Sequence, residues 1–212
     1  PFMIWTASEP LVASNPAPGL KWLAENGADN MPLSGILARK AMRRICDTGE
    51  SEKMDVAVEF LKNIWGKNDE LTLATLDGLI EGQKAKPLRP TIETKLLFSE
   101  ANVTATGQIK ERIQQLATIW GDASAIETTL ETIRNAANND HRIKAIQSVR
   151  QLKSSAARDV LLELVAHESN ERVTIEALQA LAEIGGDDVA PAIVKHWKRF
   201  TPATKRAAAD LL

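Results

Sequence analysis

Apolar residues recur three or four positions apart along the second half of the chain, and a short phrase recurs with them. Leu116–Asp122, with the sequence LATIWGD, resembles Leu181–Asp187, with the sequence LAEIGGD, 65 positions further on. Val149–Leu152 places apolar residues 33 positions after the first phrase. Each unit of roughly 32 residues holds an apolar helix, a polar or Gly-Asp turn and a second apolar helix, which is the pattern of stacked helical repeats. The pattern therefore predicts an all-α, right-handed α-solenoid.

Four units follow from this register. Helix pairs are expected at about 105–138, 139–168 and 169–198, with a partial fourth unit at 199–212. Their inward-facing stripe is made mostly of isoleucine, leucine and valine at helical spacing. Its members are Ile113, Leu116, Ile119, Ile126, Leu130, Ile133, Ile143, Ile146, Val149, Leu152, Val160, Leu161, Leu164, Val165, Val173, Ala177, Leu178, Leu181, Ile184, Val189, Ile193 and Trp197.

The last residues extend the repeat. An offset of 31 positions aligns Ala208 with Ala177 and Leu212 with Leu181, so we expect the chain to stop inside a repeat helix. Alanine at matched sites suits a close approach of neighbouring helices. Because the chain also begins at Pro1 without a methionine, we expect it to be a fragment of a larger protein.

The first part of the chain predicts longer helices outside this register. Pro10 lacks a backbone N–H and clashes with the preceding turn, so the first helix is expected to end before it. Glycine and capping residues delimit the helices that follow. These are expected from Pro16 to Gly27, over 32–47 with closure at Gly49, from Ser51 to Gly66, and after Asn68.

A proline-containing segment separates the two parts. Two prolines three residues apart make Lys84–Pro90 the clearest linker. A short helix is expected at Thr91–Phe98, followed by a connection through Gly107. We therefore predict irregular helical hairpins over 1–86 and helical repeats over 91–212, which together form one continuous superhelix.

Composition and charge exclude several classes. A chain of 212 residues with 44% hydrophobic content buries a sizeable core without a disulfide or metal. The net charge of −2 and the mixing of Lys and Arg with Asp and Glu argue against nucleic acid as a partner. Membrane insertion is not expected, because no apolar run approaches the roughly 20 residues that span a bilayer. The single cysteine, Cys46, excludes an internal disulfide and leaves the compartment open.

The strongest basic cluster is Arg39–Arg44, which holds four positive charges. The cluster could bind nucleic acid, or it could form a solvated helix face or a contact with a partner. The second interpretation is favoured because aromatic residues are not interleaved with the charges. Cys46 follows two arginines that could lower its pKa, but its place beside Ile45 favours a small buried hydrophobe.

The histidines, His141, His167 and His196, lack metal-site spacing. A structural or surface role is favoured, although equivalent positions on stacked repeats could converge.

The tryptophans are more unusual, since the chain has five of them and no tyrosine. Packing between helices is the favoured interpretation, and a platform for a sugar or aromatic ligand is the alternative. They are Trp5, Trp22, Trp65, Trp120 and Trp197.

The Gly-Asp turns are explained by helix ends. Asp122 and Asp187–Asp188 precede second helices of repeats, where an acidic residue caps free N–H groups. Gly185–Gly186 indicates a helix C-terminus, because the other residues of a phosphate loop are absent.

These phrases resemble known families. Leu181–Asp188 and its earlier echo resemble HEAT repeats of the ARM type, although the usual Pro and Asp/Arg signature is incomplete. The first part of the chain is similar to the helical region of large multidomain proteins of planctomycetes and verrucomicrobia. The similarity is carried by Phe2–Leu11, by Leu37–Arg44, and by Leu79–Gly82 with the segment to Pro87. In that family a sugar-dehydrogenase-like β-propeller precedes the helices and a c-type cytochrome domain follows them.

That resemblance implies an exported, haem-carrying redox protein as the parent, and a spacer role for this segment. No haem-attachment signature C-x-x-C-H is present, since Cys46 stands alone, so no haem residue is assigned here. We assign no catalytic, cofactor-binding or metal-binding residue. The leading hypothesis is a non-catalytic scaffold that holds neighbouring domains or offers a concave face to a protein partner. The rival hypothesis is a ligand-binding or catalytic domain with a cleft between the N-terminal hairpins and the repeats.

Overall fold

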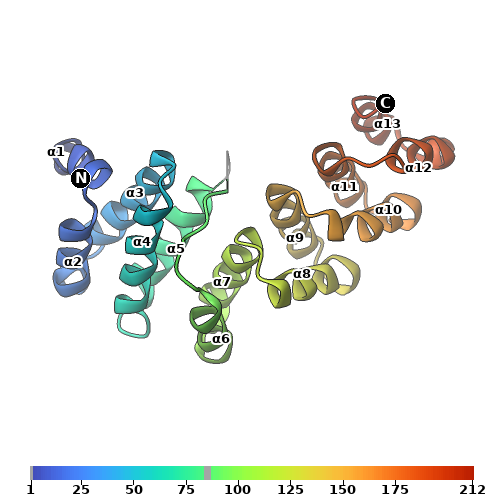
Figure 1. The fold of residues 1–212 in the computed structure, drawn as a ribbon. Coiled ribbons are helices and arrows are strands. Elements are labelled where there is room, and N and C mark those ends of the chain that lie inside the picture. The colour runs from blue at the N-terminus through green and yellow to red at the C-terminus, as the bar shows by residue number, and fades with distance from the viewer. Residues whose placement is uncertain (1, 84–86) are drawn as a thin grey trace. The chain divides into compact units, whose positions relative to one another are not determined.

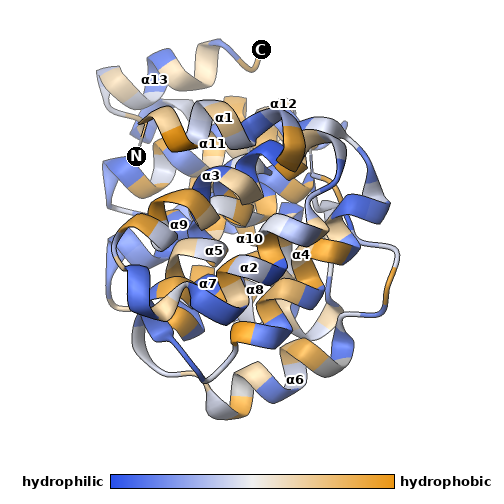
Figure 2. Ribbon diagram, turned by 90° about the vertical axis from the view of Figure 1, so that its left-hand side faces the viewer, coloured by the Kyte–Doolittle hydropathy of each residue, from blue (hydrophilic) through white to orange (hydrophobic). Residues whose placement is uncertain are grey.

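The computed structural model describes residues 2–83 and 87–212, which form thirteen α-helices, three short 3₁₀ helices and no strand (Figure 1). Hydrophobic and hydrophilic segments alternate along the helices (Figure 2). The all-α prediction is confirmed, and the stacking of helices within each part is that of an α-solenoid. The chain divides into two compact units, Pro1–Trp120 and Gly121–Leu212.

The first unit arranges its helices in two rows. α1, α3, α5 and α7 pack one against the next, while α2 packs against α4 beside them. The expected ends at Gly27, Gly49, Gly66 and Asn68 are confirmed. The helices are α1 (Phe2–Ser14), α2 (Ala17–Asn26), α3 (Leu33–Thr48), α4 (Ser51–Ile64), α5 (Asp69–Gly82), α6 (Lys95–Thr104) and α7 (Gly107–Ile119), with a 3₁₀ turn at Ala28–Asn30.

Two glycines set the distance between α3 and α5. A Cβ on Gly78 would lie 2.4 Å from the carbonyl oxygen of Arg39, and one on Gly82 would lie 2.6 Å from Cβ of Cys46. Neither position has room for a side chain, because the facing atoms include the backbone of α3. The two helices therefore pack closely along a glycine face, with Met42 fully buried between them and their neighbours.

Helix α1 corrects one expectation, since it continues through Pro10 to Ser14. The proline removes the N–H that would bond to the Thr6 carbonyl. Both residues are exposed, so water can solvate that carbonyl. The helix beyond Pro10 is retained by the packing of buried Val12 and by the contact of α1 with α3.

The segment before α6 corrects another. Helix α6 begins at Lys95 rather than at Thr91, because the carboxylate of Asp55 takes the backbone N–H groups of Thr91 and Ile92 at 2.7 and 3.1 Å. Of the predicted linker, residues 84–86 lie outside the described residues, and 87–90 are non-helical. The buried amide of Gln83 donates to the carbonyl of Leu88 (3.0 Å) and accepts its N–H (2.5 Å).

The second unit follows the predicted repeat. α9, α11 and α13 form one row, and α8, α10 and α12 form the other. The predicted apolar stripe is buried or half-buried throughout this unit. Its elements are α8 (Ala123–Asn135), α9 (Asn139–Leu152), α10 (Arg158–His167), α11 (Glu171–Ile184), α12 (Val189–His196) and α13 (Pro202–Ala209), with 3₁₀ turns at Ser155–Ala157 and Trp197–Arg199.

Caps mark the repeat length more sharply than the apolar stripe does. At the starts of α9, α11 and α13, a polar side chain accepts backbone N–H groups of the helix. These capping residues are Asn138, Asn170 and Thr201, which are 32 and 31 positions apart. Each such cap contributes about 1 kcal/mol. A polar residue therefore recurs at the same point of these three repeats because the same helix start must be satisfied, whereas Thr106 makes no such side-chain bond at the start of α7.

The end of the chain follows the repeat only in part. Ala208 is fully buried, as Ala177 is, so that alignment is confirmed. Leu212 is 60% exposed whereas Leu181 is fully buried, and the expectation that Leu212 lies in a repeat helix is wrong. The reason is that α13 ends at Ala209.

The boundary between the units does not coincide with the linker. Helix α7, which the register assigns to the unit at 105–138, belongs to the first compact unit because it packs against α5 and α6. The domain assignment of 1–86 and 91–212, and their continuity in one superhelix, stay predictions.

Candidate interaction surface

An apolar groove lies between the first three helices. Side chains of α1, α2 and α3 enclose a cavity of about 210 Å³, which we call the α1–α3 groove. Its walls are almost wholly apolar, and its polar side chain, Ser8, donates its hydroxyl to the Ile4 carbonyl within α1. The principal lining residues are Ile4, Trp5, Val12, Leu20, Trp22 and Leu37.

Exposed apolar side chains are concentrated on the three helices that form this groove, and two of them, Ile4 and Trp22, line it. Among the described residues, nine large hydrophobic side chains are exposed, and six of them belong to α1, α2 and α3. Single exposed hydrophobic residues are normal, whereas several on neighbouring helices make this part of the chain the candidate interaction surface. The six are Phe2, Met3, Ile4, Leu11, Trp22 and Ile36.

Trp5 separates the groove from a second, charged hollow. This hollow, of about 550 Å³, is lined by Phe2, Trp5 and Thr6 together with charged residues of α1 and α3. The ammonium group of Lys40 lies 5.6 Å from the centre of the Trp5 ring, which is a cation–π arrangement. Trp5 therefore presents one side to an apolar cavity and the other to positive charge.

The basic cluster Arg39–Arg44 is largely paired within the first unit. Arg39 and Arg43 share the carboxylate of Glu81, and Arg44 pairs with Glu9. The hydrogen bonds that Arg39 donates to the Glu81 carboxylate raise the pKa of Arg39, against the effect of burial. The predicted helix-face interpretation of the cluster is thus the one that the contacts support, and one carboxylate serves two guanidinium groups.

Cys46 is buried against the same helices. Its sulfur lies 3.9 Å from the sulfur of Met54 and 3.9 Å from the Leu79 carbonyl. Burial, reinforced by the charge of Asp47, raises the pKa of the thiol to about 12. The interpretation as a small buried hydrophobe is confirmed, and the neighbouring arginines do not activate the thiol.

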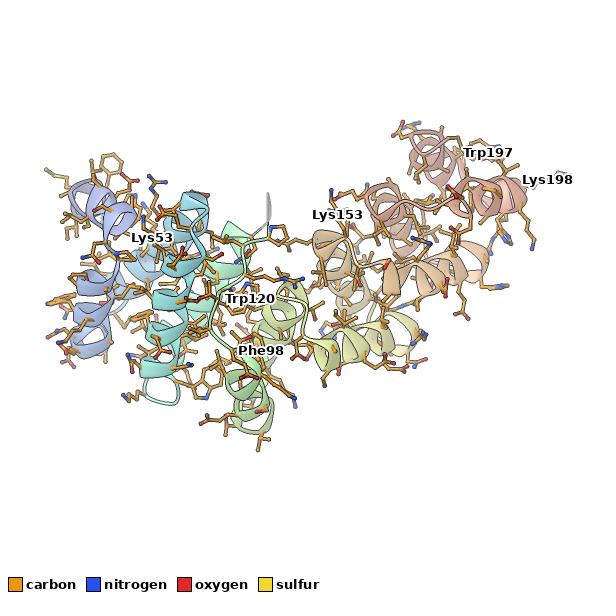
Figure 3. All side chains as sticks on the ribbon, viewed as in Figure 1. Lys53, Phe98, Trp120, Lys153, Trp197 and Lys198 are labelled. Carbon is orange, nitrogen blue, oxygen red and sulfur yellow. The ribbon has the colours of Figure 1, made fainter. Side chains whose placement is uncertain are left out.

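The tryptophans differ in how far they are buried and in what they contact. Trp120 is buried and packs on Phe98, with ring centres 5.8 Å apart (Figure 3). Trp197 is half-buried against Phe200, and Trp65 donates to the hydroxyl of Thr104 at 3.3 Å. The packing expectation is wrong for Trp22, which is 51% exposed at the mouth of the α1–α3 groove.

Two of the three histidines come together in the second unit. The rings of His167 on α10 and His196 on α12 lie 6.5 Å apart, one repeat unit from each other. Burial lowers the pKa of His196, and the positive charges of Lys195 and Arg199 and the neighbouring His167 lower it further. No group of three or more His, Cys, Asp or Glu side chains that could hold a metal occurs among the described residues.

A polar cluster that the sequence did not reveal joins the turns of the second unit. Arg142 pairs with Glu168 at 2.6 Å and donates to the Ile133 carbonyl at 3.0 Å, while Arg199 donates to the Glu168 carbonyl at 2.8 Å. Burial disfavours the charged form of Glu168, but the N–H groups of Asn170 and Ser169 and the charge of Arg142 outweigh it and lower its pKa. The available signal was the spacing of Glu168 and Arg199, which are 31 positions apart, about one repeat.

The acidic residues of the Gly-Asp turns behave differently from one another. Asp122 accepts the N–H of Ala125 at 2.9 Å, so its predicted cap is confirmed. The cap predicted at Asp188 is wrong: this residue stands before α12 but makes no side-chain cap there, and it instead lies 3.9 Å from Arg158. The predicted helix end at Gly185 is confirmed by its left-handed φ of 71°.

Comparison with known proteins agrees with this repeat. Residues 126–212 match the family model of HEAT repeats. The chain thus contains a HEAT-like repeat region, and repeats of this kind commonly mediate protein interactions. No curated protein matches the sequence. Within the described residues, none of the helices combines the length and the apolar character needed to cross a bilayer.

Proposed function

We propose that this chain is a non-catalytic helical-repeat scaffold that binds protein partners. The observation that carries the proposal is the second unit, where matched caps and paired rows of helices repeat over residues that match HEAT repeats. Such repeats build an extended surface from small local units, so their usual role is to present that surface.

The use of the polar groups supports a structural role. Arg142 and Glu168 connect turns, Arg150 of α9 pairs with Glu176 of α11 at 2.7 Å, and Asn170 caps a helix. Catalytic groups, by contrast, gather in a cleft with shifted pKa values and a free reacting position. We therefore propose that neither haem nor metal resides in this segment.

Cofactor titration tests the proposal. The purified chain is mixed with haem, a divalent metal and a quinone in turn, and binding is followed by absorbance and by bound-metal analysis. We expect no stoichiometric complex. A cofactor bound at one equivalent would refute the scaffold role.

A narrower proposal concerns the parent protein. We propose that the scaffold spaces a dehydrogenase-like propeller from a c-type cytochrome domain in an exported redox protein. This rests on the resemblance carried by Phe2–Leu11, Leu37–Arg44 and Leu79–Gly82. The full-length coding sequence tests it: a downstream C-x-x-C-H is expected, and a complete reading frame without one would exclude it.

The rival hypothesis of a ligand-binding or catalytic cleft between the hairpins and the repeats stays a prediction. It gains some support from Trp22, which is exposed rather than packed. It requires ionisable groups that face one pocket without being paired. The charged hollow beside Trp5 fits poorly, because its Arg44 and Glu9 pair with each other.

A further inference from the structure

We propose that the α1–α3 groove binds an acidic amphipathic helix of a protein partner, with one large apolar side chain in the cavity and carboxylates beside Lys40 and Arg43. This inference rests on the proposed scaffold function and names the surface and the class of partner.

The size of the groove favours a side chain over a whole ligand. Pockets for small molecules enclose about 300–1,000 Å³, whereas this cavity encloses about 210 Å³. An aromatic or aliphatic anchor that fills a small apolar pocket is the usual centre of a protein interface. Trp5 and Trp22 line the cavity and are the residue type most enriched at such centres.

The surroundings extend the apolar contact beyond the cavity. On α1, Phe2, Met3 and Leu11 are 75%, 83% and 67% exposed, while Val12 is the buried residue of this helix. Helix α1 therefore buries one narrow side against α3 and leaves other apolar side chains uncovered. Exposed apolar side chains on a helix that also lines an apolar pocket offer additional contacts to the apolar face of a partner helix.

The charged side chains beside the groove favour a partner that carries acidic residues. Arg39 and Arg43 have side chains 48% and 59% exposed, whereas the Glu81 carboxylate that they share is 25% exposed. Lys40 lies on the face of Trp5, next to the cavity. The charged residues that line the hollow are Lys40, Arg43 and Arg44 against Glu9 and Asp47, and Glu9 is paired with Arg44, so positive charge is in excess beside the groove. Carboxylates of a partner complement it.

Two other occupants fit less well. A symmetric contact between two copies of the chain would bring together the same patch of each copy, and so would double the excess of positive charge around Trp5. Nucleic acid is recognised through many phosphate contacts, and here the positive charges adjoin exposed apolar side chains in a chain of net charge −2. A helix that carries apolar residues on one face and acids on the other satisfies both properties of the surface.

Peptide selection on the whole chain tests the inference. The probe is a displayed library of helical peptides of about 15 residues, the length at which isolated helices become marginally stable. We expect the selected peptides to share a Trp, Phe or Leu anchor and Asp or Glu one to two turns away. A selected peptide is then synthesised, together with a counterpart in which each acid is replaced by lysine.

Variants assign the binding to the groove. We expect Trp22→Ala to weaken binding of the acidic peptide about tenfold, as truncation of an interface anchor does. The double variant Lys40→Glu/Arg43→Glu is expected to weaken the acidic peptide and to strengthen the lysine counterpart. Lys21→Glu, a matched charge reversal on α2 at a side chain that is 76% exposed, is expected to change neither. Circular dichroism checks that each variant is folded.

Several results would overturn the inference. They are the absence of any enriched sequence, peptides without acids, or peptides whose affinity is unchanged by Trp22→Ala and by the double charge reversal. Sedimentation showing a dimer that Trp22→Ala dissociates would assign the groove to a second copy instead. None of these results produces the cofactor complex that would refute the scaffold function, so the two failures are distinguishable.

Discussion

Replacing Gly78 with alanine adds a methyl group to the contact between α5 and α3. In open helical positions this change is favourable by about 1 kcal/mol, because alanine has the higher helix propensity. At Gly78 the new Cβ would lie 2.4 Å from the Arg39 carbonyl oxygen and 2.8 Å from its Cα, whereas ordinary contacts begin near 3.4 Å. These atoms belong to backbone and cannot rotate away, so the helices must move apart by about 1 Å, the difference between 3.4 and 2.4 Å. Overpacking of this kind costs about 1–3 kcal/mol.

Gly19 provides the matched control. It also lies in a helix, α2, but a Cβ there meets nothing within 4 Å. We expect Gly78→Ala to lower the free energy of unfolding of the first unit by about 1–3 kcal/mol, and Gly19→Ala to raise it by about 0.4–1 kcal/mol.

Urea unfolding followed by tryptophan fluorescence suits this comparison. Four of the five tryptophans lie in the first unit and report on it, while Trp197 lies in the second. A Gly78→Ala protein as stable as the Gly19→Ala protein would refute the close α3–α5 packing.

Three further predictions concern single side chains. Asn170→Ala should lower the stability of the second unit by about 1 kcal/mol in urea unfolding, because the cap of α11 is lost; an unchanged midpoint would contradict the cap. Because the folded state lowers the pKa of Glu168, its contribution is present above the ordinary value of 4.5 and is lost as pH falls through the folded pKa. Glu168→Gln should therefore cost about 1–3 kcal/mol at pH 7 and flatten the acid limb of the stability curve, and an acid limb equal to that of the wild type would be the contrary result. With its pKa raised to about 12, the Cys46 thiol should resist alkylation at pH 8 in the folded protein and react once urea is added; rapid alkylation without urea would disprove its burial.

The repeat half could be predicted well because its signals are local and periodic. Leu181 and Val149 mark the apolar stripe, and the helix starts at Asn138 and Asn170 require a polar cap at each repeat. Such features depend on residues within one or two turns. The positions of these helices could therefore be predicted from the local sequence pattern.

The remaining features depend on residues distant in the sequence. Helix α6 starts late because Asp55, 36 positions before Thr91, takes the N–H groups there. Trp22 is exposed although it lines the groove, and periodicity within α2 alone does not report how neighbouring helices cover it. The Arg142–Glu168 pair joins two turns across a repeat. The candidate surface was missed for the same reason: it is formed by three helices together.

Native mass spectrometry of the purified chain, mixed with haem, zinc and an acidic helical peptide from the selection, tests the central claim most directly. The scaffold account predicts a one-to-one peptide complex and no cofactor adduct, and it predicts that the Lys40→Glu/Arg43→Glu protein loses the peptide. A stoichiometric haem or zinc adduct, with no peptide complex, would contradict it.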